Sequence, residues 1–282
     1  MEASRQTYVT VVKPRRGWRF PDLREVREHR DLLYYLARRD VLVRYKQAVI
    51  GVFWAVLQPV VLAGVFSLFL GVVLELPAPE GIPYPLFAVT GMVMWLAFTS
   101  AIQTASESTV TSEPLISKIY FPRILIPIAS VVPSIVDFGF GFIVVVGISL
   151  AYGLTPPIAI LTVPLILLLA VTTALGAGIW LSALNVRYRD VHLVVPLLVL
   201  VGLFVTPVIY PLQELIDLVP QSIQAVYALN PMVGVLEGFR WAMLGTDWPG
   251  WLMVFPVLSS VFLLFTGVLY FERAESTFAD VI

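Results

Sequence analysis

The 282-residue chain contains no cysteine and only two histidines, His29 and His192. The missing cysteine excludes disulfides, thiolate metal sites and cysteine nucleophiles. The two histidines lie far apart in the sequence, which argues against a histidine-based metal site. Charged residues make up 13% of the chain, whereas soluble domains carry about 25%. A water-soluble fold of this length would therefore have too little polar surface.

Motifs that bind nucleotides or catalyse hydrolysis are also missing. The sequence has no G-x-x-x-x-G-K-[ST] phosphate loop, no G-x-G-x-x-G after a strand pattern, no G-x-S-x-G and no H-E-x-x-H. A net charge of −1 gives no general attraction to nucleic acid. We therefore expect neither a catalytic site nor a cofactor in this chain. Any driven work would take its energy from another chain or from an ion gradient.

Apolar residues, in contrast, are abundant: they make up 59% of the chain and form long uncharged runs. A helix needs about 20 apolar residues to cross about 30 Å of hydrocarbon. Six stretches meet or nearly meet that length, which predicts an all-α, polytopic membrane protein with six transmembrane helices. The stretches are 48–74, 86–105, 124–152, 158–184, 193–210 and 251–271.

The basic residues predict the orientation of these spans. Twelve of the 18 Lys and Arg residues precede residue 50, and cytoplasmic segments are enriched in Lys and Arg. Six spans with a cytoplasmic N-terminus also place the connections 106–123 and 185–192 and the C-terminal tail in the cytoplasm. Of the remaining basic residues, only Arg240 then falls on the outer side.

The segment before the first span divides into two parts. Residues 1–21 mix Pro, Gly and basic residues, and we predict an irregular leader. Residues 22–47 suit a partly amphipathic helix, in which Leu32, Leu36 and Val43 share one face that Arg39 interrupts. Such a basic helix typically lies in the membrane interface; the alternative is a solvated helix that only fixes topology. Residues 48–282 are predicted to form the transmembrane domain.

The outer connection 211–250 is too apolar for a simple loop. Asn230 and Pro231 are typical of a helix start, and Gly245 of a helix end. The helix between them would rise about 21 Å, too little to cross a bilayer. We predict a re-entrant hairpin; the alternative is a hairpin that lies flat on the membrane. Glu237 and Arg240 are three residues apart and can pair on one helix face.

Asp137 is an ionisable residue within the predicted third span. An acid at membrane depth can be a coupling site for an ion. It can equally be a packing device bonded to Ser or to backbone on a neighbouring helix. Gly139 and Gly141 favour the packing interpretation, because small residues permit close contact between helices.

The cytoplasmic connection 112–122 carries several large apolar side chains and one charge. Pro114 can start a short helix and Pro122 can end it, which predicts a helix over 115–121. A surface of this kind needs a cover, and a partner protein is the natural one. The alternative is that the segment folds under its own helices or into lipid head groups. Its residues are Pro114, Leu115, Ile116, Lys118, Ile119, Tyr120 and Phe121.

Six short segments follow one known pattern. They are Arg44-Tyr45-Lys46-Gln47, Gly51-Val52-Phe53-Trp54, Leu57-Gln58-Pro59, Asn185-Val186-Arg187-Tyr188-Arg189-Asp190, Thr206-Pro207-Val208-Ile209-Tyr210-Pro211 and Leu229-Asn230-Pro231-Met232. Together they resemble ABC-2 type permeases that export polysaccharides and polyol phosphates. The resemblance runs from about residue 30 to the end of the chain and leaves out the first 20 residues.

This resemblance implies a homodimer of six-span subunits in the bacterial inner membrane, with cytoplasmic termini. Two copies of a separate ABC ATPase subunit would bind ATP and magnesium and contact 22–46 and 112–122. The outer hairpin would form a gate. The substrate would be a glycan on polyprenyl diphosphate or a related lipid, such as O-antigen or teichoic acid. The residues assigned to the gate are Tyr210, Pro211, Asn230, Pro231, Glu237 and Arg240.

Two further sets of residues are candidates for contact with such a substrate. A diphosphate head group needs cations, and Arg binds phosphate oxygens in bidentate fashion; the same cations can instead hold topology and anionic lipid. The cations nearest the first span are Arg38, Arg39, Arg44 and Lys46. Aromatic rings in the channel can stack on sugars or simply pack in the protein. The candidates are Phe53, Trp54, Trp95 and Phe98.

Two other functions stay open at this point. An ABC-2 exporter of small lipids or drugs would have the same architecture. A membrane enzyme that acts on polyprenyl-linked sugars would usually need acidic clusters for a metal-bound diphosphate, and the predicted loops offer none.

Overall fold

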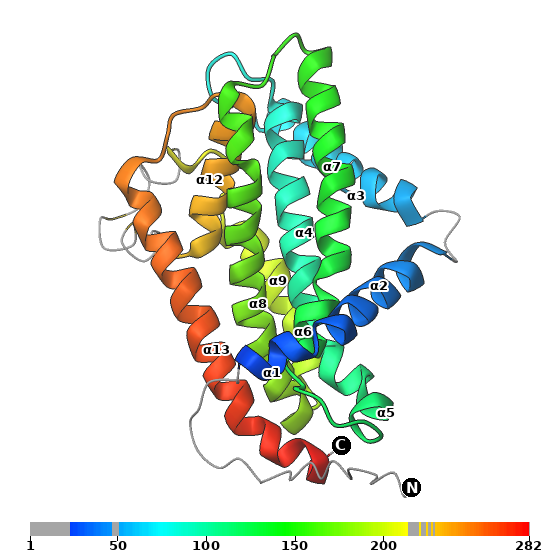
Figure 1. Ribbon diagram of the computed structural model, residues 1–282. Helices are drawn as coiled ribbons and strands as arrows, with labels where there is room; N and C mark the ends of the chain where they lie inside the picture. Colours follow the sequence, from blue (N-terminus) through cyan, green and yellow to red (C-terminus); the bar gives the residue numbers. More distant parts are fainter. Residues whose placement is uncertain are drawn as a thin grey trace, which may run out of the picture.

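The computed structural model describes residues 23–46, 51–213 and 229–281, together with the single positions 220, 224 and 227. Every element in these described residues is a helix (Figure 1), as the sequence predicts. The predicted leader 1–21 and much of the first half of the outer hairpin lie outside the described residues.

Five helical stretches are long and apolar enough to cross a membrane, and they coincide with five of the six predicted spans. The remaining predicted span, 193–210, which is the fifth along the chain, is helical only as α9 (Val191–Val205). That helix rises about 22 Å. The chain is therefore a multi-span membrane protein, and the span predicted at 193–210 remains a prediction. The five stretches are Gly51–Val73, Tyr84–Thr111, Leu125–Ala151, Ile158–Arg187 and Val254–Ser276.

Three of these stretches are built from two consecutive helical segments. Pro133 and Pro164 stand in the first turns of α7 and α8, where proline is tolerated because its missing N–H would have no helical partner. Helix α4 (Tyr84–Thr111) is continuous, and α13 (Val254–Val281) follows a 3-10 turn at Gly250–Met253. The composite stretches are α3 (Gly51–Phe66) with a π-helix (Ser67–Val73), α6 (Leu125–Ser130) with α7 (Val132–Ala151), and a 3-10 turn (Ile158–Thr162) with α8 (Val163–Arg187).

Helix α4 forms the centre of the bundle. It packs against α3, α7, α8 and α12, and its residues Leu86, Met94 and Ala105 are fully buried. The peripheral helices α3 and α13 expose apolar side chains such as Phe53 and Phe262. Exposed apolar side chains on long helices are expected where lipid is the solvent.

Helices α8 and α13 approach each other closely at two glycines. A Cβ added to Gly267 would lie 2.6 Å from the carbonyl oxygen of Gly176, and one added to Gly176 would lie 2.6 Å from the backbone nitrogen of Leu264. The rings of Trp180 and Tyr270 stack beside this contact, with centroids 4.3 Å apart. Small residues let helix backbones touch, which is how spans associate where no hydrophobic force acts between them.

Helices α1 (Leu23–Glu28) and α2 (Arg30–Lys46) lie obliquely across the bundle, and α2 packs against α6 and α7 (Figure 1). The predicted apolar stripe is only partly buried: Leu36 is buried, Leu32 is half-buried and Val43 is exposed. An oblique helix touches its neighbours with a face that changes along its length, so a straight stripe cannot stay in contact. The interfacial position of α2 remains a prediction.

Two short helices lie towards opposite ends of the bundle. Helix α5 (Glu113–Ile116) lies at the end where α13 terminates, and α12 (Pro231–Leu244) lies nearer the other end (Figure 1). The prediction of a helix over 115–121 is wrong, because the helix is a single turn that ends at Ile116. A residue before a proline avoids helical backbone, so Pro122 does not allow the helix to reach Phe121.

The predicted bounds of α12 are confirmed. The Asn230 side chain accepts a hydrogen bond of 3.0 Å from the backbone nitrogen of Met232, as an N-cap does. Gly245 ends the helix with a φ of 71°. That left-handed conformation favours glycine, which has no Cβ to clash.

Candidate functional site

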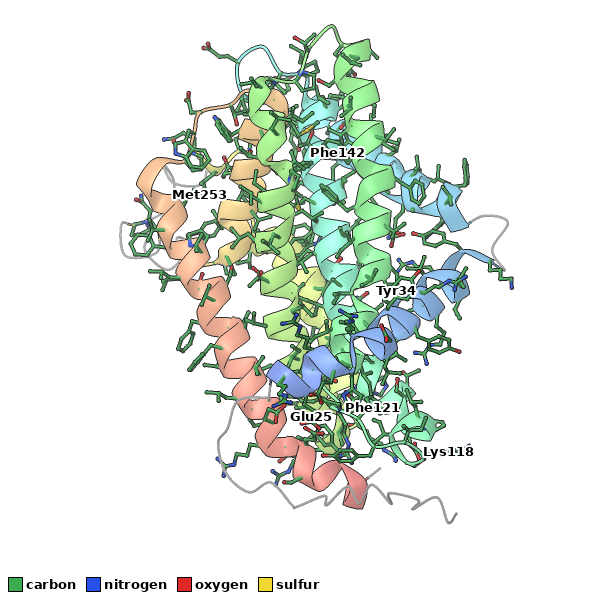
Figure 2. All side chains as sticks on the ribbon, viewed as in Figure 1. Glu25, Tyr34, Lys118, Phe121, Phe142 and Met253 are labelled. Atoms are coloured by element: carbon green, nitrogen blue, oxygen red, sulfur yellow. The ribbon has the colours of Figure 1, made fainter. Side chains whose placement is uncertain are left out.

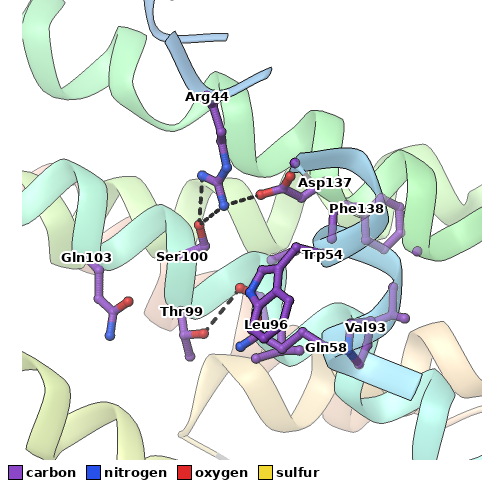
Figure 3. Close-up of a pocket in the computed structure, with 15 residues that line it drawn as sticks. Arg44, Trp54, Gln58, Val93, Leu96, Thr99, Ser100, Gln103, Asp137 and Phe138 are labelled. Carbon is purple, nitrogen blue, oxygen red and sulfur yellow. Dashed lines mark hydrogen bonds and ion pairs between the residues drawn. The ribbon is translucent and has the colours of Figure 1, made fainter. Parts of the chain in front are cut away.

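A cavity of about 470 Å³ lies between α2, α3, α4 and α7. Apolar side chains, among them Trp54, Val93 and Phe138, form part of its lining (Figure 3). Polar side chains form the rest, and they come from α2, α3, α4 and α7. The polar residues are Arg44, Gln58, Thr99, Ser100, Gln103 and Asp137.

The charged group of this cavity is an ion pair between Arg44 on α2 and Asp137 on α7. Both terminal nitrogens of Arg44 also donate to the Ser100 hydroxyl at 3.2 Å, and Ser134 donates to the same hydroxyl at 3.0 Å. Figure 3 shows the guanidinium between Ser100 and Asp137. These contacts attach the end of α2 to α4 and α7 at the cavity wall.

Tyr45 completes the environment of Asp137. Its hydroxyl donates to one carboxylate oxygen, while Arg44 pairs with the other. Burial and the hydrogen bond to Asp137 raise the pKa of Tyr45, so the phenol keeps the proton that it donates. The expectation that Asp137 bonds to Ser or backbone is wrong, because its partners are a cation and a phenol on α2.

The four predicted head-group cations are divided by the structure. Arg44 lines the cavity, whereas Arg38, Arg39 and Lys46 are exposed around a shallow hollow on the other face of α2. Arg39 pairs there with Asp40 at 2.8 Å. The four therefore do not form one site, and their predicted contact with a diphosphate stays a prediction.

The four predicted channel aromatics are divided as well. Trp54 lines the cavity and is 56% exposed, and Phe53 beside it is also exposed. Trp95 and Phe98 pack against each other, with ring centroids 5.6 Å apart, and Trp95 is buried in the core. Their positions favour packing for Trp95 and Phe98 and leave Trp54 as the ring that can face a molecule in the cavity.

The connection between α5 and α6 is part exposed and part buried. Ile119 and Tyr120 are 54% and 59% exposed, and Pro114 and Lys118 are exposed too. Phe121 is buried and packs, with Leu115 and Ile116, against residues of α1, α2 and α6. Figure 2 shows Phe121 close to α2 and Lys118 towards the tip. The predicted surface is thus reduced to the tip of the connection.

The segment after α9 is irregular, and side chains bond to its backbone carbonyls. Arg240 on α12 donates to the carbonyls of Pro207 and Val208, both at 2.7 Å. It also pairs with Glu237 at 2.9 Å, which confirms the predicted contact, and lies 3.8 Å from the centroid of the Phe87 ring. Arg240 is only 1% exposed. It therefore stabilises the buried, irregular backbone after α9 and does not lie on an outer surface.

Tyrosines bond to the neighbouring carbonyls. Tyr84 on α4 donates to Ile209 at 2.5 Å, and Tyr210 donates to Phe204 at 2.8 Å. The Asn230 side-chain amide donates to the Thr206 hydroxyl at 3.1 Å. Irregular backbone is tolerated at membrane depth only where protein or water satisfies it. Four of the six predicted gate residues, Tyr210, Asn230, Glu237 and Arg240, therefore belong to a hydrogen-bonded joint between α9, α12 and α4.

The sequence does not single out the polar side chains of α4. Thr99, Ser100 and Gln103 lie close together in a mostly apolar span, and this spacing within about one turn is the signal that could have indicated a polar cavity. Within the described ranges, no group of three or more acidic or histidine side chains is placed to hold a metal ion. The cavity's groups suit non-covalent binding of a polar or anionic molecule.

Comparison with known proteins assigns the fold. The profile of the ABC-2 type transporter family matches residues 31–244, which include α2, the cavity helices and α12. The chain belongs to the ABC-2 type transporter family. Membership of this family implies an ABC ATPase as a partner.

The chain is also similar to permeases of known ABC-2 systems. An O-antigen export system permease protein RfbA from Myxococcus xanthus is 28% identical over 262 residues, covering 92% of this chain and 98% of the relative. An O-antigen export system permease protein RfbA from Klebsiella pneumoniae is 25% identical over 253 residues, covering 89% and 95%. The similarity extends over almost the whole of each protein.

Proposed function

We propose that this chain is the transmembrane permease subunit of an ATP-driven exporter for a lipid-linked polysaccharide. The substrate is a cell-envelope glycan such as O-antigen or teichoic acid. It moves from the cytoplasmic to the outer side of the bacterial inner membrane. The observation that carries the proposal is the near full-length similarity to permeases of O-antigen export systems.

The proposed assembly contains two copies of this chain and two ATPase subunits, which bind ATP and magnesium. Each chain crosses the membrane six times, with α9 and the segment that follows it as the fifth span, and both termini are cytoplasmic. Lys118, next to the exposed Ile119 and Tyr120, lies at the same end of the bundle as the end of α13 (Figures 1 and 2). That shared position supports a cytoplasmic contact of the tip with the ATPase.

In the proposed mechanism, α2 lies at the inner membrane interface. Its exposed face combines Tyr34 and Val43 with the cations Arg38, Arg39 and Lys46. A basic face with apolar side chains suits a surface of anionic lipid. Arg44 and Trp54 at the cavity then offer a cation for a phosphate and an aromatic face for a sugar ring.

The outer end of the path is assigned to the hairpin around α12. Asn230 and Arg240 hold α12 against the irregular segment after α9. Side-chain hydrogen bonds at such a joint can break and re-form more readily than the backbone hydrogen bonds of a continuous helix. Movement at this joint would open and close the outer side, with Tyr210, Pro211, Pro231 and Glu237 also at or beside it.

Deletion and complementation of the gene in its own organism test the proposal against its alternatives. We expect the deletion strain to lose surface glycan and to accumulate lipid-linked polymer inside, with both effects reversed by the wild-type gene. An exporter of small lipids or drugs would leave surface glycan normal. A membrane enzyme on polyprenyl-linked sugars would change the structure of the polymer and not its location.

A further inference from the structure

The ion pair at the cavity wall has a feature that a purely structural pair does not need. Asp137 has two hydrogen-bonded oxygens, one bound by Arg44 and the other by Tyr45. If Arg44 moved away, the carboxylate would still accept a hydrogen bond from Tyr45. Asp137 would therefore keep one hydrogen-bond partner, which lowers the usual cost of separating such a pair.

Arg44 is also placed to take a second anion. Its side chain is 36% exposed, whereas that of Asp137 is 14% exposed, and both line the cavity. Its contacts with Ser100 and Asp137 do not use all five N–H donors of a guanidinium. A phosphate entering the cavity would meet the guanidinium before it met the carboxylate.

The remaining cavity lining does not repel such a molecule. Gln58, Gln103 and Thr99 offer neutral donors and acceptors, and Trp54 offers an apolar ring face. Asp137 is the only acid that lines the cavity among the described residues. The one group that opposes an incoming anion is thus the group that already holds Arg44.

We propose that Asp137 is an exchangeable counterion, which occupies Arg44 in the empty cavity and yields it to the phosphate of a lipid-linked substrate. The inference rests on the proposed function and states how the head group of the substrate is recognised. Exchange makes binding reversible: the carboxylate competes with the phosphate, so that it weakens binding and favours release. The Tyr45 hydroxyl satisfies Asp137 while Arg44 holds the substrate.

The test measures binding to the full-length chain in phosphatidylcholine nanodiscs, with undecaprenyl diphosphate as the lipid probe and inorganic pyrophosphate as the soluble probe. Asp137→Asn is expected to tighten binding about fivefold, because the competing charge is removed while the side-chain shape is kept. Arg44→Gln is expected to weaken binding about tenfold or more, and Arg44→Lys less. Arg30→Gln, on the exposed start of the same helix, serves as the matched control and is expected to bind like the wild type.

Probe binding by Tyr45→Phe is a second test, and this variant changes neither the charge of Arg44 nor that of Asp137. Without the phenol, Asp137 holds Arg44 more strongly, so binding should weaken about threefold. Tighter binding of both probes by Asp137→Asn supports the exchange and shows that phosphate groups suffice. Tightening with the lipid probe alone supports the exchange and shows that the lipid is required.

Equal or weaker binding by Asp137→Asn overturns the inference, since the carboxylate would then position Arg44 or only stabilise the fold. Failure of the wild-type chain to bind either probe overturns it as well. The proposed function is judged separately, by glycan export in the complemented strain. If the wild-type chain exports glycan but Asp137→Asn does not bind more tightly, only the exchange hypothesis is rejected. A wild-type chain that exports no glycan removes the proposed function, whatever the binding series shows.

Discussion

Gly91 on α4 lies directly against the carbonyl oxygen of Val208: a Cβ built on Gly91 would be 2.2 Å from that oxygen. The same Cβ would be 2.9 Å from a terminal nitrogen of Arg240. The central helix therefore presents bare backbone where the irregular segment and its arginine approach. Only glycine allows this contact without displacing one of the three.

Gly91→Ala is expected to destabilise the protein by roughly 1–3 kcal/mol, as overpacking of a tight site does. Gly139→Ala is the matched control, because a Cβ at Gly139 would meet nothing within 4 Å. For the control we expect no loss, and at most about 1 kcal/mol of gain from the better helix former. Unfolding free energies in mixed detergent micelles decide; equal stability of the two variants would show that the joint is not packed as described.

Arg240→Met keeps the length of the side chain but removes the donors to Pro207 and Val208. Each buried carbonyl left without a partner costs about 1–3 kcal/mol, so the variant should unfold at a clearly lower temperature than the wild type. Arg187→Met is the control, since Arg187 is exposed and lies over Tyr188. The same small change in both variants would mean that water, and not Arg240, satisfies the segment after α9.

The exposed tip after α5 is expected to act in coupling and not in folding. Ile119→Asp with Tyr120→Asp should leave stability within about 0.5 kcal/mol, as for other surface positions, while it abolishes ATPase association and export. Phe121→Ala should instead destabilise by about 3–5 kcal/mol, because Phe121 is buried. Pull-down of the ATPase and export assays measure the first effect. Normal export by the double variant would assign coupling to another surface.

A cross-link at the start of α12 tests the outer gate. Most of α12 is buried within its own subunit, so Leu229, which is 57% exposed, is the better place for an engineered cysteine. The native chain has no cysteine and gives no background. Linking Leu229→Cys across the dimer should block export, leave ATP binding intact and be reversed by reducing agent. Polymer export at the full rate through the linked dimer would favour a hairpin that lies flat on the membrane.

Features that depend on a few neighbouring residues could be predicted from the sequence. Asn230 and Gly245 mark the ends of α12 because capping uses bonds and backbone angles within one turn. The pair of Glu237 and Arg240 follows from helical spacing alone. The apolar runs predict six spans, and the structure has five helical stretches of that length, since the bilayer sets how long a span must be.

Contacts between distant segments could not be predicted. Tyr45 and Asp137 are 92 positions apart, and an acid within a span signals a polar partner without saying which one. The carbonyls that Arg240 binds follow a helix whose end was placed too late, because 193–210 reads as one apolar run. Phe121 and Ile119 are both large apolar residues in the same segment. Only the packing in the structure shows that Phe121 is buried and Ile119 is exposed.

The most direct test of the central claim is transport by the purified complex. The chain and its ATPase are reconstituted in proteoliposomes that contain the lipid-linked glycan, and the glycan that becomes accessible on the far side is measured with and without ATP. We predict glycan transfer that requires ATP, requires both subunits and is lost in the Ile119→Asp, Tyr120→Asp variant. Transfer without ATP, or ATP hydrolysis with no glycan transfer by the wild-type complex, would contradict the assignment of this chain as a polysaccharide permease.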